Sequence, residues 1–181
     1  MQDLALQYAI AMALMGVAFA FDIVIGDPPS KLHPVVWMGY AIKGLKKLNK
    51  GSPLRRKLLG VVAALTAIAM FVVPTSLALK VLREVSLALY IILGGLAFKF
   101  TFAFKSLSDY TKPIADTLQR GDLEGAKSYL PFIVRRDPSK LDEELIVSAA
   151  VESIAESTVD GITSPLFYYA LLGIPGAYAF R

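Results

Sequence analysis

Cysteine is absent from this sequence, and histidine occurs once, as His33. The first absence excludes disulfide bonds and thiolate metal sites, and the scarcity of histidine excludes a metal centre built from several imidazoles. Charged residues are scarce as well, at 19% of the 181 residues, whereas 55% are hydrophobic. This composition is too apolar for an ordinary soluble domain of the same size and favours an integral membrane protein.

Long uncharged stretches with a helical rather than a strand-like pattern make up much of the chain. They predict an all-α, polytopic membrane protein whose helices span the bilayer near 4–25, 58–79 and 85–104. Lys99 interrupts the third stretch, and we expect its ammonium to reach toward a lipid headgroup layer. A fourth segment, 162–180, is broken by prolines and glycines, so a kinked span and a re-entrant segment are alternatives there.

Basic residues are distributed unevenly between the predicted connections. Residues 26–57 hold eight lysines and arginines, 80–84 hold two in a tight turn, and 105–161 hold seven. By the positive-inside rule the amino terminus faces outward, and the loops 26–57 and 105–161 are cytoplasmic parts of a single membrane domain, 1–181. A net charge of +4 is typical of membrane proteins with basic cytoplasmic loops. We therefore expect a multi-pass protein of the cell membrane that contacts lipid and does not bind nucleic acid.

Residues 147–161, VSAAVESIAESTVDG, place three acids at intervals of four: Glu152, Glu156 and Asp160. On an α-helix this spacing aligns the carboxylates in one stripe, where like charges repel each other. A solvated helix face is one interpretation. The other is a bound divalent cation or a cationic partner, because either would offset the repulsion. Oxygen ligands without histidine or cysteine suit Mg²⁺.

Two connections hold further polar residues that suit a functional site. Asp22 and Asp27 flank the end of the first apolar stretch, where a Gly-Asp-Pro-Pro turn is followed by His33 and a proline. The alternative role of Asp27 is to satisfy local backbone amides. Arg135 and Arg136 match the geometry of phosphate groups, although such pairs also occur as loop charge that faces lipid headgroups. No phosphate-binding loop of the Gly-x-x-x-x-Gly-Lys-Ser/Thr type is present.

Three stretches of the chain together resemble a known family. They are FDIVIGDPPSKLHPVVWMG at 21–39, RRDPSKLDEELIVSAAVESIAESTVDGITSPLFYYALLG at 135–173, and GAYAFR at 176–181. In this order they are similar to the adenosylcobinamide-phosphate synthases of cobalamin biosynthesis, the CbiB/CobD membrane proteins. The combination of a Gly-Asp-Pro-Pro turn, a His-Pro turn and a Glu-Ser-x-Ala-Glu-x-x-x-Asp-Gly helix makes the resemblance specific.

The resemblance implies an acid–amine ligase that depends on ATP and Mg²⁺. Such an enzyme joins a carboxylate of adenosylcobyric acid, a corrinoid, to aminopropanol or its phosphate through an amide bond. The acidic stripe then acquires a role, because Glu152, Glu156 and Asp160 would hold Mg-ATP or act as the base that takes a proton from the amine.

The remaining polar residues would complete the same site. With the resemblance as a guide, Arg135 and Arg136 are expected to contact phosphate. Asp27 and His33 are expected to contact substrate or phosphate from the other cytoplasmic loop. The resemblance does not separate the individual roles of these side chains.

This chain departs from the family in two respects. The family usually has asparagine where this sequence has Ser157, and its members continue beyond the position of Arg181. The chain therefore resembles the amino-terminal portion of the family, and its expected partners are a missing carboxy-terminal half or further copies of itself. The alternative function is non-catalytic or partner-dependent, as an AmpE-like sensor or one half of a split synthase. The residues do not distinguish between aminopropanol, its phosphate and ethanolamine analogues.

Overall fold

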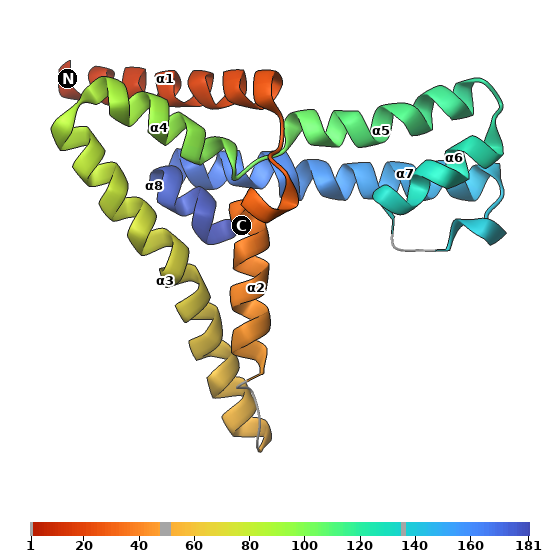
Figure 1. Ribbon diagram of the computed structural model, residues 1–181, viewed down its shortest axis with the longest axis horizontal. Helices are drawn as coiled ribbons and strands as arrows, with labels where there is room; N and C mark the ends of the chain where they lie inside the picture. The colour runs from red at the N-terminus through yellow and green to blue at the C-terminus, as the bar shows by residue number, and fades with distance from the viewer. Residues whose placement is uncertain (1, 48–51, 135–136) are drawn as a thin grey trace. The chain divides into compact units, whose positions relative to one another are not determined.

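The computed structural model describes residues 2–47, 52–134 and 137–181. The α-helices are α1 (Gln2–Ile25), α2 (Pro34–Lys46), α3 (Pro53–Val85), α4 (Leu87–Lys99), α5 (Phe104–Gln119), α6 (Leu123–Tyr129), α7 (Glu143–Thr158) and α8 (Ser164–Phe180) (Figure 1). Short 3-10 turns, η1 (Ser30–Leu32), η2 (Leu130–Phe132) and η3 (Pro138–Lys140), and a π-helical segment, η4 (Val159–Thr163), lie between them. No described residue lies in a β-strand, which confirms the all-α prediction.

The helices form two compact units. Unit 1 comprises Met1–Phe102 and Pro165–Arg181, and unit 2 comprises Ala103–Ser164. The bounds of unit 2 lie within three residues of the 105–161 loop that the sequence predicts. The apolar stretches and the polar connection therefore pack as separate bodies, each with its own core.

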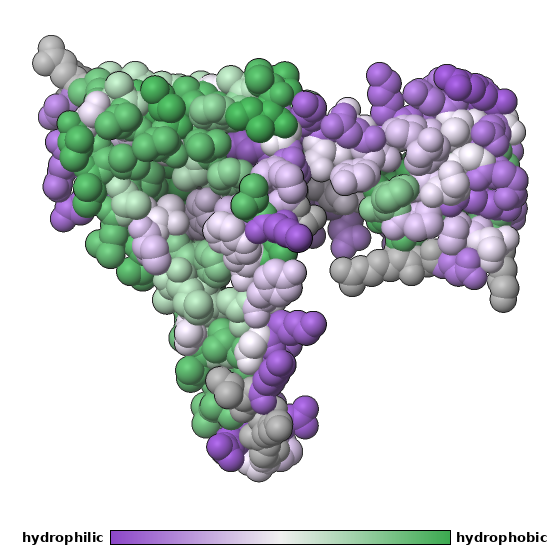
Figure 2. Space-filling model, viewed as in Figure 1, coloured by the Kyte–Doolittle hydropathy of each residue, from purple (hydrophilic) through white to green (hydrophobic). Residues whose placement is uncertain are grey.

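Three segments of the described chain are long and apolar enough to cross a membrane: Asp3–Ile25, Pro53–Val85 and Leu87–Gln119. No more than a third of the most apolar window in each is buried within the protein. Figure 2 shows the resulting hydrophobic surface over α1, α3 and α4. Because so much exposed apolar surface is typical of contact with lipid rather than water, the structure confirms a multi-pass membrane protein. The side that the amino terminus faces stays a prediction.

Two boundaries differ from those that the sequence predicts. The expected turn at 80–84 is helical, because α3 continues to Val85, and the chain reverses at Ser86. The Ser86 hydroxyl accepts a hydrogen bond from the Leu89 N–H at 3.4 Å and so caps α4. The third apolar segment is also interrupted, because α4 ends at Lys99 and residues 100–103 are not helical. The predicted break in 162–180 is confirmed at Gly173, whose φ is 69°.

Helices α1 and α4 run in the same general direction, inclined to each other, and touch through two glycines of α4 (Figure 1). A Cβ atom on Gly94 would lie 2.8 Å from Cδ2 of Leu14, and one on Gly95 would lie 2.5 Å from Cγ1 of Val17. Contacts this short leave no room for a side chain, so the two backbones approach as closely as small-residue helix pairs do in membranes. The pairing also places the end of α4 beside Asp22.

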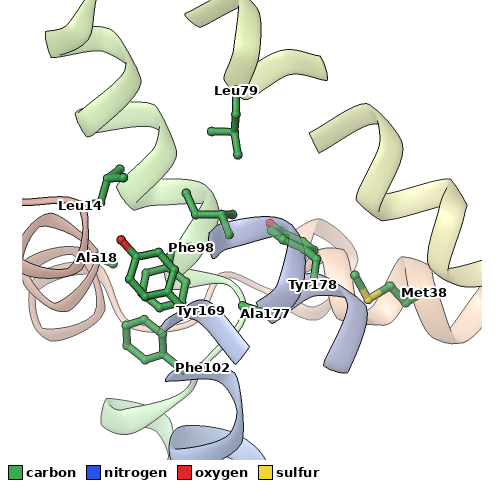
Figure 3. Packing of buried hydrophobic residues seen from close by; sticks show 10 residues of the cluster. Leu14, Ala18, Met38, Leu79, Phe98, Phe102, Tyr169, Ala177 and Tyr178 are labelled. Atoms are coloured by element: carbon green, nitrogen blue, oxygen red, sulfur yellow. The ribbon is translucent and has the colours of Figure 1, made fainter. Parts of the chain in front are cut away.

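Aromatic side chains fix α8 against α1 and α4 in the core of unit 1. The rings of Phe98 and Tyr169 stack with centroids 4.1 Å apart, and Phe102 meets Phe98 edge-on at 5.3 Å (Figure 3). The Tyr169 hydroxyl donates to the Ala11 carbonyl oxygen at 2.8 Å, so its polar end is satisfied within the apolar core. Phe98 is fully buried, and Lys99 is the next residue.

Unit 2 packs α5, α6 and α7 around a separate apolar cluster of Ile114, Ala126, Leu130, Ile146 and Ala150. The Asp122 carboxylate caps α6, because it accepts from the Gly125 N–H at 2.8 Å. Asp142 caps α7 in the same way. Asp137 caps η3, and the hydrogen bond from the Ser139 backbone N–H lowers the pKa of the Asp137 carboxyl.

The π-helical segment η4 has a local cause in the sequence. Pro165 has no N–H to donate to the Gly161 carbonyl, and a proline ring crowds the carbonyl four residues before it. The Ala103 N–H donates to that carbonyl at 3.0 Å. Asp160, the last acid of the stripe, therefore lies in a π-helical turn rather than in α7. Such turns occur often at functional sites.

Substituting Gly95 with alanine is expected to destabilise unit 1, because the added Cβ would lie 2.5 Å from Cγ1 of Val17. Overpacking of this kind typically costs about 1–3 kcal/mol. The matched control is Gly39→Ala on α2, where a Cβ would have nothing within 4 Å. The unfolding midpoint of the detergent-solubilised protein measures both, and a Gly95→Ala midpoint equal to that of the parent would contradict the close α1–α4 packing.

Candidate functional site: a buried lysine between two carboxylates

The segment that follows α1 forms a tight polar turn in unit 1. Gly26 has a φ of 70°, a left-handed conformation that glycine adopts without strain. Its N–H donates to the Asp22 carbonyl oxygen at 2.9 Å and so ends the helix. Asp27 and two prolines then carry the chain into η1 and to the start of α2 at Pro34, so the sequence itself restricts the backbone that carries the Asp27 carboxylate.

Lys99, the last residue of α4, pairs with two carboxylates: Asp22 near the end of α1 and Asp27 in this turn. Its Nζ atom lies 3.3 Å from Oδ1 of Asp22 and donates a short hydrogen bond to Oδ1 of Asp27. Lys99 is 1% exposed and Asp22 is 0% exposed. The prediction that Lys99 reaches toward lipid headgroups is therefore wrong, because its ammonium is held inside the protein by oppositely charged groups from α1 and the following turn.

His33 completes the group. It caps α2 by accepting a hydrogen bond at Nδ1 from the Val35 N–H at 3.2 Å. An accepting nitrogen carries no proton, so the neutral ring bears its hydrogen on Nε2. That atom lies 3.8 Å from Oδ1 of Asp27. We call Asp22, Asp27, His33 and Lys99 the Lys99 cluster.

Because the Lys99 cluster is largely buried, each of its charges needs a partner of opposite charge. In an apolar interior a charge is tolerated only when it is paired, because water no longer solvates it. The cluster lies next to the aromatic core, since Phe98 immediately precedes Lys99 and the His33 ring meets the Phe100 ring edge-on at 6.0 Å. Asp27 is the most accessible charged member, with 24% of its side chain exposed.

Sequence reasoning selected Asp27 and His33 as site residues, and the structure brings these two together. Sequence reasoning did not identify Lys99 as the residue that pairs with Asp27. The signal was present, because a single lysine within a long apolar run is typically paired and functional. What the sequence did not reveal was the identity of the partners, since Asp27 lies 72 residues away along the chain.

The acidic stripe belongs to unit 2. Glu152 and Glu156 lie on α7 and Asp160 on η4, and all three residues are exposed. Arg135 and Arg136 lie outside the described residues, so their predicted phosphate contacts stay a prediction. The catalytic and metal-binding roles of the three acids likewise stay predictions.

The donor set of the stripe fits Mg²⁺ only in part. Eight residues of helix advance by about 12 Å, whereas Mg²⁺ holds its ligands at about 2.1 Å, so Glu152 and Asp160 do not reach one ion together. In agreement, no three Asp, Glu or His side chains among the described residues form a metal-binding group. Two neighbouring acids suffice, however, for an ion that also binds phosphate oxygens.

Comparison with known proteins identifies relatives along nearly the whole chain. A family model described as "CobD/Cbib protein" matches residues 15–181. A probable cobalamin biosynthesis protein CobD of Thermoplasma acidophilum is 37% identical over 91% of this chain and 53% of its own length. The cobalamin biosynthesis protein CobD of Dehalococcoides mccartyi is 36% identical over 91% of this chain and 54% of its own length.

A third relative, the probable cobalamin biosynthesis protein CobD of Methanocaldococcus jannaschii, is 34% identical over 93% of this chain and 56% of its own length. The chain thus spans about half the length of the curated relatives it matches. No solved structure shows significant similarity to it.

Replacing Lys99 with methionine is expected to destabilise unit 1 strongly, because it leaves the buried Asp22 carboxylate without this ammonium. Loss of one partner of a buried pair typically costs about 3–5 kcal/mol. The control is Lys80→Met on α3, where the lysine is exposed and its loss should leave the unfolding midpoint unchanged. Equal midpoints for the two variants would show that the Lys99 pairing does not contribute to the fold.

Proposed function

Because the chain belongs to the CobD/Cbib family and is thereby a membrane protein of cobalamin biosynthesis, we propose that it contributes to an ATP-dependent amide ligation. The reaction joins a carboxylate of adenosylcobyric acid to aminopropanol or its phosphate. The observation that supports this proposal is the match to the family over residues 15–181, with relatives named for cobalamin biosynthesis. The motifs at 21–39 and in the acidic stripe resemble the same family and agree with this proposal.

The chemistry has two requirements. A carboxylate is a poor acyl donor, so a ligase of this kind transfers a phosphoryl group from ATP to the acid before the amine attacks. The amine nitrogen then forms the new C–N bond while the C–O bond to phosphate breaks, and inorganic phosphate leaves. The site must therefore hold phosphates, bind an amine and accept a proton from it.

The acidic stripe suits the phosphate side of this reaction. Mg²⁺, when bound, neutralises phosphate charge. Glu156 is the central acid of the stripe and pairs with either neighbour, so it is the carboxylate best placed to hold the ion with Glu152 or with Asp160. The remaining acid is proposed as the base. Arg135 and Arg136 are proposed as phosphate contacts on the basis of the family resemblance.

A second candidate function is that of one half of a split synthase, or of a subunit that needs a partner chain. A sensor related to AmpE is the third candidate. Binding of cobyric acid and Mg-ATP without turnover would favour the partner-dependent subunit, and binding of neither would favour the sensor.

Membranes that contain only this chain are expected to convert adenosylcobyric acid to the cobinamide product with ATP, Mg²⁺ and aminopropanol phosphate. Glu156→Gln should lower the rate at saturating Mg²⁺ by at least about tenfold, because loss of a charged ligand or base typically has effects of this size. Product analysis by chromatography measures both. Full turnover by Glu156→Gln would exclude its assigned role, and absence of product from the parent would exclude a complete synthase in this chain.

The Mg²⁺ requirement offers a separate test of the stripe. Glu152→Gln is expected to raise the Mg²⁺ concentration needed for half-maximal product formation, because one carboxylate ligand is lost. Glu143→Gln is the matched control, since Glu143 is also exposed on α7 but lies in its first turn. The titration contradicts the assignment if both variants follow the curve of the parent.

A further inference from the structure

The hairpin of α2 and α3 carries concentrated positive charge. Between Asp27 and Glu84 the sequence has no aspartate or glutamate, yet residues 28–57 hold eight lysines and arginines. Six of them lie at the end of α2 and the start of α3, and all six are exposed: Lys43, Lys46, Lys47, Arg55, Arg56 and Lys57. We call these six residues the basic patch. No ion pair joins any of them to a carboxylate among residues 2–47, 52–134 and 137–181.

Helix α2 does not follow the direction of the membrane-spanning segments. In Figure 1 it runs across the direction of α1, and both helices belong to unit 1. Its 13 residues reach about 20 Å, which is less than the thickness of the hydrocarbon core, about 30 Å. Because α1 crosses the membrane, a short helix that runs across its end lies along the membrane surface.

The two faces of α2 differ in the way that this position requires. Met38 is buried in the core of unit 1, whereas Lys43 and Lys47 lie one turn apart on the opposite face. Tyr40, three residues before Lys43, is exposed on the same side, and Trp37 is exposed one turn before the lysines begin. Lysine together with tyrosine and tryptophan is the combination that amphipathic helices present at a membrane interface.

The start of α3 places the other half of the basic patch beside apolar surface. Arg55, Arg56 and Lys57 lie within its first five residues, and no acid accompanies them. Exposed apolar side chains follow directly at Leu58, Val61 and Leu65. Figure 2 shows this boundary, with hydrophilic residues along α2 and hydrophobic surface along α3. The patch thus lies where polar headgroups meet hydrocarbon.

The same three cations are electrostatically unfavourable without a partner. The amino-terminal end of a helix carries the positive end of the helix dipole, so cations there destabilise the helix. Like charges on α2 and α3 also repel one another across the hairpin. An anionic partner would offset both costs.

We propose that the basic patch binds anionic phospholipid headgroups and that α2 is an interfacial helix on the same membrane surface. An extended partner fits better than a single small phosphate ligand, because consecutive residues such as Arg55, Arg56 and Lys57 point about 100° apart around a helix and do not converge. The positive-inside rule predicts that this surface is cytoplasmic, and the negative potential of that leaflet attracts basic segments next to spanning helices. This role is independent of the proposed ligation.

The first test compares lipids with the purified 181-residue chain in detergent micelles. We expect phosphatidylglycerol to raise the unfolding midpoint more than phosphatidylcholine does, because a ligand that binds the folded state stabilises it. At about 1 M NaCl the difference should disappear, since the Debye length falls to about 3 Å. Equal effects of the two lipids, or a difference that persists at high salt, would overturn the proposal.

The second test locates the contact. Arg55→Gln with Arg56→Gln should require at least about tenfold more phosphatidylglycerol for the half-maximal rise, because each basic residue near the surface is worth several-fold in lipid affinity. The midpoint without lipid should stay near that of the parent, since both side chains are exposed. Lys112→Gln with Arg120→Gln is the matched control, because it removes the same charge from exposed positions of α5.

The comparison of the two double variants has a definite adverse outcome. Equal losses of lipid affinity would mean that net charge, and not the basic patch, determines binding. A rise with inorganic phosphate in phosphatidylcholine micelles that Arg55→Gln with Arg56→Gln abolishes would assign the patch to a soluble phosphate ligand. Either result overturns the proposal.

The third test measures the depth of α2 directly, because Trp37 is the single tryptophan of the sequence. The protein is placed in vesicles of phosphatidylcholine and phosphatidylglycerol in which part of the phosphatidylcholine carries bromine on its acyl chains. We expect bromine close to the headgroups to quench the fluorescence of Trp37 more strongly than bromine close to the chain ends. Stronger quenching from the bilayer centre, or no quenching by either lipid, would exclude an interfacial α2.

Discussion

The ion pairing of Lys99 is the interaction on which the geometry of the candidate site depends. A buried ammonium must be accompanied by negative charge, and here α1 and its following turn provide the two carboxylates, Asp22 and Asp27. This requirement couples three separate pieces of chain: the end of α1, the turn before α2, and the end of α4. Gly26 adopts the left-handed conformation that starts that turn, and the prolines that follow Asp27 restrict its backbone.

The pairing is possible only because α1 and α4 approach closely. Gly94 and Gly95 have no side chains to hold the helices apart, and the stacked rings of Phe98 and Tyr169 fix α8 beside them. A polar site is thereby built inside a unit whose outer surface is apolar, as Figure 2 shows for α1, α3 and α4. The low dielectric that surrounds such a site strengthens each ionic contact within it.

The two units bring different chemistry to the proposed ligation. Unit 1 holds the partly exposed Asp27 carboxylate beside the Lys99 ammonium. Unit 2 holds the exposed acids of the stripe on α7 and η4.

Several features of the fold were predictable from local sequence. Helices end where Gly26 and the prolines force them to, and Asp122 caps α6 because its side chain reaches an N–H only three residues away. The boundary at Ser86 and the cap at Asp142 were missed. Neither position has a glycine or proline next to it that would mark a helix boundary.

The sequence by itself determined that this protein is helical and embedded in a membrane, because uncharged runs of this length admit no other stable arrangement in lipid. It also determined the spacing of the acidic stripe and the motifs of the family. The tertiary structure alone decided that Lys99 pairs inward. A lysine in an apolar run has to find either lipid headgroups or a carboxylate, and only the close packing of α4 on α1 shows that a carboxylate is within reach.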